Sequence, residues 1–489
     1  MKDRFPCLIA IVGLVCVVSG FAASAAVKNQ GSVPARPNFL LIISDDLNDW
    51  ITPMKGHPEA KTPALETIAA RGVTFMNAQS PAPLCNPSRT AFMSGKRPST
   101  TGIYHNQQTW MKYIPRGLCI NDYIRQHGFK SYGAGKIYHY RNYRADEWDE
   151  VFYVSDDTLP RSVADRCPGP HGYRMFTDGA PQGPYQEQRA ESALVDAKSV
   201  SWCIDKLKTT NRFFMTCGIH RPHTPWDVPK KYFDLYPAGS VALPKLLTND
   251  LSDVPPAGVA MANPTGMHPR VLQAGVWQDR VRAYLAAVSY MDAQVGRLIE
   301  ALDNSAHRDN TIVVFVGDNG WHLGQKEHWG KTTLWANGAS VPMIWAVPGM
   351  TRGSLCEHGV DLMCIYPTVC EFAGVPLPKH VEGISIKPLI ENPAAKWAQP
   401  GISTMYKDNH TLVTADWRYI RYADGSEELY NRKADPLEWT NLAAKAELAS
   451  VKKELAGFLP KVNADSVPSE DPAKKKKKKK GKAAAVRGE

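Results

Sequence analysis

Asn38-Phe39-Leu40-Leu41-Ile42-Ile43-Ser44 is an apolar run that ends in Asp45-Asp46. A strand with one face in water alternates apolar and polar residues, whereas this run is apolar at almost every position. That pattern is typical of a strand buried on both faces of a parallel sheet. The two adjacent carboxylates at its end repel each other unless a cation lies beside them.

Three more segments repeat this arrangement of an apolar strand followed by polar residues. Phe129–Ala134 is followed by Lys136 and His139, Phe213–Gly218 by His220 and His223, and Thr311–Val316 by Asp318 and Asn319. Helical patterns separate these strands, and such alternation predicts an α/β fold with a mainly parallel sheet between two layers of helices. Because open parallel sheets bind ligands at the carboxyl ends of their strands, we expect the four polar clusters to form one site.

The pattern changes after Pro400. Short strands at His410–Ala415, Trp417–Tyr422 and Glu427–Tyr430, with turns between them, predict a small antiparallel α+β subdomain. We therefore expect a catalytic α/β domain over residues 27–400 and a C-terminal subdomain over residues 401–465. Residues 466–489 form a low-complexity, lysine-rich tail that we expect to be disordered.

The N-terminus has the composition of an export signal. Lys2 and Arg4 precede the apolar run Cys7–Val18, and small residues follow at Ala22–Ala26. The run is too short for a transmembrane helix, and we expect no transmembrane segment elsewhere. We predict a signal peptide over residues 1–26 and an exported protein that is periplasmic or secreted, or lysosomal if the source is an animal.

The formal net charge of +10 lies mostly outside the predicted domains. The tail carries seven consecutive lysines, Lys474–Lys480, and residues 27–473 have a net charge of only +1. A basic surface for nucleic acid is therefore not predicted. The cysteines form no CxxC pair, which argues against structural zinc.

Oxygen ligands at two of the strand ends indicate a metal site. Asp45, Asp46, Asp318 and Asn319 suit a hard cation, and we expect Ca²⁺, with Mg²⁺ as the alternative. Either pair alone has a simpler interpretation, because Asp-Asp and Asp-Asn are also common in helix caps and loop turns.

The segment Cys85-Asn86-Pro87-Ser88-Arg89, continued by Gly95-Lys96-Arg97-Pro98, carries the most specific functional pattern. It resembles the signature of the formylglycine-dependent sulfatases, C-x-P-S-R followed by a glycine and a basic residue before proline. The resemblance implies an alkaline phosphatase-like fold. It also implies that a formylglycine-generating or anaerobic sulfatase-maturing enzyme oxidises Cys85 to formylglycine, whose hydrate is the nucleophile. The alternative is a buried cysteine before a helix.

The chemistry explains why a thiol is replaced. A sulfated cysteine would have no easy route back to free enzyme. An aldehyde hydrate carries two hydroxyls on one carbon, so that one attacks sulfur and deprotonation of the other expels sulfate. The covalent step divides one difficult displacement into two easier ones.

The resemblance to this family extends to about residue 440, and the sequence is similar in particular to the iduronate-2-sulfatases. Gly135–His139 resembles the G-K-x-x-H motif, in which Lys136 and His139 hold and deprotonate the hydrate. Gly218–Pro225 resembles the H-K-P-H-x-P motif, in which His223 protonates the leaving oxygen. The segment that contains Asp318 and Lys331 resembles the D-H-G-W…K motif, in which Asp318 would bind the metal and Lys331 would bind the sulfate group.

The resemblance thus implies two overlapping sets of residues. The catalytic residues are Cys85, Arg89, Lys136, His139, His223 and Lys331, of which Lys136, His223 and Lys331 also bind substrate. The metal ligands are Asp45, Asp46, Cys85, Asp318 and Asn319. Asn319 and Arg221 depart from the pattern, which has histidine and lysine there, and the role of His220 stays open between orienting its loop and acting in the site.

We therefore predict an exported, metal-dependent sulfatase acting on a carbohydrate, in particular 2-O-sulfated uronate or a related sulfated polysaccharide fragment. One alternative is a phosphonate or phosphate ester hydrolase of the same fold. Another is a sulfated-glycan binding protein in which Cys85 stays a thiol.

Overall fold

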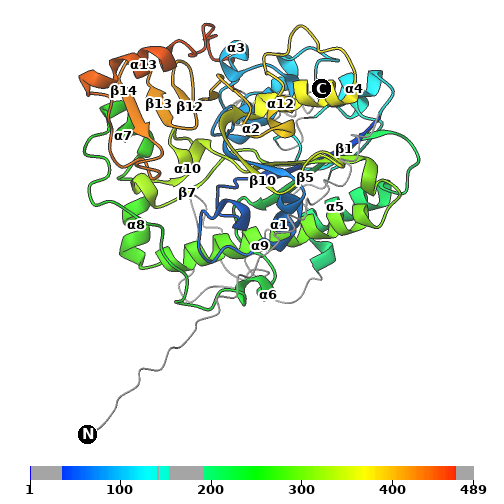
Figure 1. The fold of residues 1–489 in the computed structure, drawn as a ribbon, viewed down its shortest axis with the longest axis horizontal. Helices are drawn as coiled ribbons and strands as arrows, with labels where there is room; N and C mark the ends of the chain where they lie inside the picture. Colours follow the sequence, from blue (N-terminus) through cyan, green and yellow to red (C-terminus); the bar gives the residue numbers. More distant parts are fainter. Residues whose placement is uncertain (2–35, 140–142, 154–190, 470–489) are drawn as a thin grey trace, which may run out of the picture.

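The computed structural model describes Met1 and residues 36–139, 143–153 and 191–469 (Figure 1). The predicted signal peptide after Met1, and the tail from residue 470, lie outside the described residues. Residues 140–142 and 154–190, which include most of a segment rich in Gly and Pro, also lie outside them. Among the described residues, no helix is both long and apolar enough to cross a membrane.

An eight-stranded sheet forms the centre of the described chain, in the order β10-β2-β9-β6-β1-β5-β3-β4. Its strands are β1 (Asn38–Asp45), β2 (Val73–Gln79), β3 (Lys130–Gly135), β4 (Glu150–Phe152), β5 (Phe213–Pro222), β6 (Thr311–Gly317), β9 (Met343–Ala346) and β10 (Ser354–Asp361). All neighbouring pairs are parallel except those of β9, which runs antiparallel to both β2 and β6. The predicted mainly parallel sheet is confirmed, and β9 is its antiparallel strand.

Strand β1 shows why the sheet needs helices on both faces. Leu40 and Ile42 belong to one apolar cluster, and Phe39, Leu41 and Ile43 to the other. All five side chains are at most 1% exposed. Burying each one contributes about 2 kcal/mol, and this gain requires a cover on each side of the strand.

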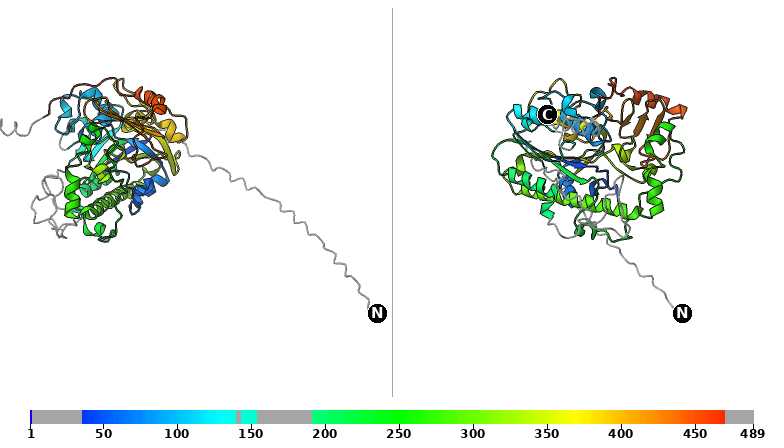
Figure 2. Two further views of the ribbon diagram at one scale, coloured as in Figure 1. Left: turned by 90° about the vertical axis from the view of Figure 1, so that its left-hand side faces the viewer. Right: turned by 180° about the vertical axis from the view of Figure 1, so that it is seen from behind.

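The helices divide between these two clusters (Figures 1 and 2). On one face lie α1 (Pro63–Ala70), α5 (Val195–Lys206), α6 (Lys230–Phe233) and α9 (Trp277–Asp303). On the other lie α2 (Cys85–Ser94), α4 (Ile120–Gln126), α11 (Ile365–Ala373) and α12 (Lys387–Glu391), with the short α3 (Pro98–Thr101) following α2. The predicted sandwich of a sheet between helices is confirmed.

A second sheet of four antiparallel strands forms the C-terminal subdomain, in the order β11-β12-β13-β14. Its elements are β11 (Gly401–Thr404), β12 (His410–Val413), β13 (Trp417–Arg421), β14 (Glu427–Asn431) and α13 (Ala449–Ala456). The chain then returns to the main domain, where Ala464 N donates to Ser99 O at 2.7 Å and Val467 N to Gly102 O at 2.9 Å. The part of the expected tail around Val467 is therefore bonded to the main domain.

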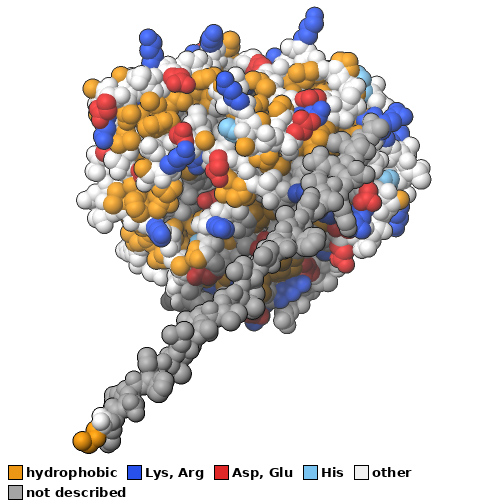
Figure 3. Space-filling view, viewed as in Figure 1, with side chains coloured by type: hydrophobic (Ala, Val, Ile, Leu, Met, Phe, Trp, Pro, Cys, Tyr) orange, Lys and Arg blue, Asp and Glu red, His pale blue; other side chains and the backbone are white. Residues whose placement is uncertain are grey.

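The described chain also contains short elements outside the two large sheets. They are α7 (Pro256–Ala262), α8 (Met267–Ala274), α10 (Ala336–Ala339) and the two-stranded sheet of β7 (His322–Leu323) and β8 (Trp329–Gly330). Figure 1 shows them on the same side of the molecule as the C-terminal subdomain. Figure 3 shows basic and acidic side chains interspersed over this view, without a large area of one sign.

Candidate active site

The end of β1 turns sharply at the two aspartates. The pairing of β1 with β5 shifts between Ser44 and Asp45, and Asp46 takes a left-handed backbone conformation with φ of 60°. Aspartate tolerates this conformation better than most residues. The Asp46 amide donates to Asp318 Oδ1 at 3.0 Å, which joins the ends of β1 and β6. Both aspartates are fully buried.

Two glycines let the ends of β3 and β5 approach each other. A Cβ on Gly135, whose φ is 71°, would lie 2.0 Å from the Gly218 carbonyl oxygen. A Cβ on Gly218 would lie 2.1 Å from the Lys136 carbonyl oxygen. Only glycine fits at both positions, and this close crossing brings Lys136 and His220 toward the end of β1.

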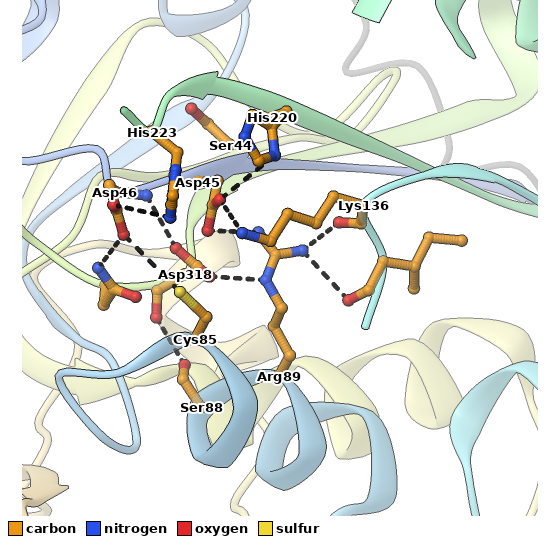
Figure 4. A network of polar contacts seen from close by, with 12 residues as sticks. Ser44, Asp45, Asp46, Cys85, Ser88, Arg89, Lys136, His220, His223 and Asp318 are labelled. Atoms are coloured by element: carbon orange, nitrogen blue, oxygen red, sulfur yellow. Dashed lines mark hydrogen bonds and ion pairs between the residues drawn. The ribbon is translucent and has the colours of Figure 1, made fainter. Parts of the chain in front are cut away.

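Helix α2 delivers the basic and nucleophilic residues of the Cys85 segment. It begins at Cys85, and Pro87 is tolerated there because proline in the first turn sacrifices no helical hydrogen bond. Arg89 is fully buried: its Nε donates to Asp318 Oδ2 at 2.6 Å and its Nη2 to Asp45 Oδ1 at 3.3 Å (Figure 4). Its Nη1 donates to the carbonyl oxygens of Lys136 and Ile137.

Cys85 lies at the N-terminal end of α2 and faces the aspartates (Figure 4). Lys331 Nζ donates to Cys85 Sγ at 2.7 Å and also to Asp46 Oδ1. The sulfur itself lies 3.8 Å from Asp46 Oδ1. The N-terminus of α2 and the ammonium group of Lys331 therefore lie beside this sulfur, where an anion could bind.

The remaining predicted residues reach the same cluster from β3 and β5. Lys136 Nζ forms an ion pair with Asp45 Oδ2. His220 Nδ1 lies 3.8 Å from that oxygen, and His223 Nε2 lies 3.7 Å from Asp46 Oδ2. His139 is buried nearby, where its electrostatic partners include Lys136 and Lys331. The structure thus brings all the predicted site residues together at the carboxyl ends of β1, β3, β5 and β6.

The donor set fits a hard cation. Asp46 Oδ2 and Asn319 Oδ1 are buried and accept no hydrogen bond from any described residue. Asn319 Nδ2 donates to Asp46 Oδ1 at 2.8 Å, which leaves the amide oxygen available as a ligand. Ligand atoms of Asp45, Asp46, Cys85 and His223 lie within 4.8 Å of one another. Both oxygens of Asp318 already accept hydrogen bonds, so a metal would have to share one of them.

Charge balance also favours a cation. Three carboxylates, Asp45, Asp46 and Asp318, face three bases, Arg89, Lys136 and Lys331. Burial raises the pKa of Asp318 to about 7, against the charge of Arg89. Burial and the neighbouring Asp45 also raise the pKa of Asp46. A divalent cation would favour the ionised form of both carboxyls and would leave the site positive enough to attract a sulfate ester.

The thiol of Cys85 and the imidazole rings of His139 and His223 are neutral in this environment. Burial, reinforced by the charge of Asp45, raises the pKa of Cys85, so the unmodified thiol is not a thiolate at neutral pH. Burial and the charge of Lys136 lower the pKa of His223 to about 3 and that of His139 to about 2. His223 Nδ1 lies 2.6 Å from the Thr224 carbonyl oxygen and donates to it, so Nε2 is the atom that can gain a proton.

Two further residues support the site without having been singled out in the sequence. Ser88 Oγ donates to the Asp318 carbonyl oxygen at 2.6 Å, and His328 Nε2 lies 2.8 Å from the Lys331 carbonyl oxygen. The position of Ser88 in the C-x-P-S-R pattern was the only available signal for it. No signal marked His328, since its contact is with a backbone atom.

Comparison with known proteins decides the family. Residues 37–375 match the sulfatase family model, and residues 324–465 match the model of the N-sulphoglucosamine sulphohydrolase C-terminal region. The chain belongs to the sulfatase family. Members hydrolyse sulfuric esters, and the predicted family, fold and enzyme class are confirmed.

Individual relatives of this sulfatase share most of its length. It is 34% identical to a sulfatase of Formosa agariphila, over 95% of this chain and 93% of that protein. It is 28% identical to human iduronate 2-sulfatase, over 75% of this chain and 74% of that protein. Among solved structures, a phosphonate monoester hydrolase from Silicibacter pomeroyi has the same fold, with a TM-score of 0.71 and 20% identity over 86% of this chain and 94% of that one.

Proposed function

We propose that this sulfatase is exported and hydrolyses sulfate esters of carbohydrates through a formylglycine formed from Cys85. The observation that carries the proposal is the position of Cys85, buried at the start of α2 with Lys331 Nζ 2.7 Å from its sulfur and Asp46 3.8 Å away. A thiol kept neutral by its surroundings is a poor nucleophile there. An oxygen nucleophile on the same carbon would suit both the lysine and the neighbouring oxygen ligands.

The chemistry then runs in two steps on the hydrated aldehyde. One hydroxyl oxygen of the hydrate attacks sulfur, the bond from sulfur to the sugar oxygen breaks, and the sugar leaves as an alcohol after taking one proton. The second hydroxyl of the resulting sulfate hemiester then loses its proton to a base, the carbonyl re-forms, and sulfate departs as the dianion. Addition of one water regenerates the hydrate, so that the net reaction consumes one water per ester.

Two histidines are the candidates to move these protons. His223 Nε2 points into the site and would donate to the leaving sugar oxygen. An anionic ester beside it favours the protonated imidazole and counteracts the burial that otherwise keeps this ring neutral. His139, neutral beside Lys136, would accept the proton of the second hydroxyl.

The bases would bind the sulfuryl group. Lys331 and Lys136 lie on either side of the two aspartates, and Arg89 fixes Asp45 and Asp318 in place. Asp45, Asp46, Asp318, Asn319 and the modified residue 85 would hold Ca²⁺ or Mg²⁺. The bound metal supplies positive charge next to the oxygens that carry negative charge in the transition state.

The substrate class follows from likeness. The match to human iduronate 2-sulfatase extends over three quarters of both chains and supports a 2-O-sulfated uronate, or a related sulfated polysaccharide fragment, as substrate. The composition of residues 1–26 supports export, and the Cys85 segment supports maturation by a formylglycine-generating or anaerobic sulfatase-maturing enzyme.

Turnover of paired substrates tests this proposal. Protein co-expressed with a maturing enzyme is assayed on 4-nitrophenyl sulfate, 4-nitrophenyl phosphate and a phenyl phosphonate ester. The expected result is the highest kcat/KM on the sulfate. A preference for the phosphate or the phosphonate would replace the proposal with a phosphoryl ester hydrolase. Binding of a sulfated disaccharide without turnover of any ester would replace it with a glycan-binding protein.

A further inference from the structure

An aromatic pair lies beside the site but takes no part in the chemistry. The rings of His105 and Tyr406 have centroids 4.7 Å apart and an interplanar angle of 31°. Tyr406 is 38% exposed, and His105 is half-buried. His105 lies in the loop after α3, and Tyr406 lies at the tip of the hairpin between β11 and β12.

The backbone beside each ring is hydrogen-bonded to the short segment that contains Cys85. The amide of Thr404, two residues before Tyr406, donates to the Pro81 carbonyl oxygen at 2.9 Å. On the other side of Cys85, Asn86 Nδ2 donates to the His105 carbonyl oxygen at 2.9 Å. The Asn86 amide donates to Asn106 Oδ1 at 3.0 Å. The pair therefore has a fixed position next to the N-terminal end of α2.

The hairpin holds Tyr406 in an unfavourable backbone conformation. Tyr406 has φ of 60° and Asp408 has φ of 64°, in the left-handed region that bulky residues avoid. Two bonds close the tip, from the Met405 amide to the Asn409 carbonyl oxygen at 3.0 Å and from Asn409 Nδ2 to the Lys407 carbonyl oxygen at 2.9 Å. Strain of this kind persists where the surrounding structure fixes it, often in ligand-binding segments.

We propose that the His105–Tyr406 pair is a binding platform for the sugar ring that adjoins the sulfated residue. This inference rests on the proposed function. An exposed aromatic face stacks against the C–H face of a pyranose, and the phenol supplies a polar edge for its hydroxyls. The bond of Asn86 to the His105 loop places the platform within a few residues of the nucleophile, which suits the next ring of an oligosaccharide.

The charges around the platform indicate which ring it takes. Lys407 Nζ is paired with Asp465 Oδ1 at 2.6 Å, and Asp408 adds a further negative charge. Among these three described residues, the negative charges of Asp465 and Asp408 offset the positive charge of Lys407, so they would not attract a second sulfate. The platform therefore suits an unsulfated pyranose, such as an N-acetylhexosamine.

Kinetics on two substrates of different length test the platform. The probes are 4-nitrophenyl sulfate and a disaccharide of 2-O-sulfated uronate linked to N-acetylglucosamine. Tyr406→Ala is expected to lower kcat/KM for the disaccharide about tenfold, through KM, and to leave the aryl sulfate unchanged. Tyr406→Phe should keep most of the disaccharide activity. Leu355→Ala, which truncates another exposed apolar side chain on β10, is the matched control and should change neither substrate.

Equal losses on both substrates would assign Tyr406 a structural role and overturn the inference, as would no loss on either. Calorimetric titration of the same disaccharide into Cys85→Ala, with and without Tyr406→Ala, separates this result from the proposed function. If the wild-type protein cleaves no sulfate ester, the proposed function fails. A Kd that Tyr406→Ala leaves unchanged overturns the platform independently of turnover.

Discussion

Two of the buried charge clusters among the described residues differ in whether their polar atoms have hydrogen-bond partners. The active-site cluster contains Asp46 Oδ2 and Asn319 Oδ1, which accept no hydrogen bond from the described chain. The second, which we call the Arg418 cluster, consists of Arg418, Glu438, Lys326 and Asp250. None of these four side chains has a buried polar atom without a partner among the described residues.

The Arg418 cluster joins the C-terminal subdomain to the loop that carries Lys331. Arg418 donates to Gln79 Oε1 at 3.1 Å, to Thr411 Oγ1 at 3.0 Å and to Ser340 Oγ at 2.9 Å, in addition to its ion pair with Glu438. Lys326, five residues before Lys331, reaches Asp250 Oδ1 at 2.6 Å and the Glu438 carbonyl oxygen.

The difference shows that buried charge alone does not mark a catalytic site. A fully bonded cluster has no capacity left for a ligand and serves to fix structure. A cluster with unpartnered oxygens carries an energetic cost that a bound ion or substrate can offset. Lys326 and Lys331, which lie on either side of β8, should therefore respond differently to mutation.

The largest expected effect concerns these two lysines. Lys331→Ala should lower kcat/KM by about 10³-fold, because it removes a positive charge aimed at the reacting group. Lys326→Ala should leave kcat of the folded protein within a few-fold but lower its melting temperature. Steady-state kinetics and thermal unfolding of both variants measure these effects. Loss of kcat in Lys326→Ala but not in Lys331→Ala would show that the catalytic and structural roles are assigned the wrong way round.

The next effect is on stability. Arg418→Leu leaves Glu438 buried without its partner and should lower the free energy of unfolding by about 4 kcal/mol. Arg421→Leu, on the same strand, removes a more exposed ion pair, in which Arg421 Nη1 lies 3.9 Å from Glu427 Oε1. This change should lower the free energy of unfolding by less than about 1 kcal/mol. Urea denaturation compares the two. Equal losses of unfolding free energy would mean that the buried Arg418–Glu438 pair contributes no more to stability than the exposed pair.

Metal removal should act on the active-site cluster only. Chelation should lower the free energy of unfolding by about 3 kcal/mol relative to protein in metal at 100 times Kd. In Asp46→Asn this difference should shrink to a small fraction, whereas in Arg421→Leu it should persist. Melting temperatures with and without EDTA provide the test, and an undiminished EDTA effect in Asp46→Asn would remove Asp46 from the ligand set.

The smallest effect is a pH dependence in the C-terminal subdomain. Burial lowers the pKa of His410 to about 4, so the unfolded chain takes up a proton below pH 6.5 while the folded chain does not. Stability is therefore lost as the pH falls, by about 2 kcal/mol between pH 7.5 and pH 5. The stability difference between wild type and His410→Gln should change by this amount over that range. A pH-independent difference would show that His410 titrates normally.

Much of the fold followed from local patterns, and its exceptions have physical reasons. The apolar strands and the polar residues after them were visible because strands buried on both faces have a distinctive composition. The direction of β9 was not visible, since the composition of an apolar strand of four residues does not depend on whether the strand is parallel or antiparallel to its neighbours. Strand β10 was missed because Glu357 and His358 interrupt its apolar pattern.

The site divides in the same way. Residues such as Lys136 and His223 lie at strand ends and within motifs, so sequence alone identified them. Arg418, Glu438 and His328 have no such signal, because their roles depend on backbone atoms and side chains far away in the chain. The exposed aromatic pair likewise forms only when the β11–β12 hairpin meets the loop after α3.

The mass of the tryptic peptide Gly72–Arg89, from protein co-expressed with a maturing enzyme, tests the central claim most directly. The peptide contains Cys85 and no internal Lys or Arg. We predict that residue 85 has lost H₂S and gained one oxygen, as conversion of a thiol to an aldehyde requires, and that Cys85→Ala protein is inactive. An unmodified thiol in protein that still cleaves 4-nitrophenyl sulfate would contradict the account.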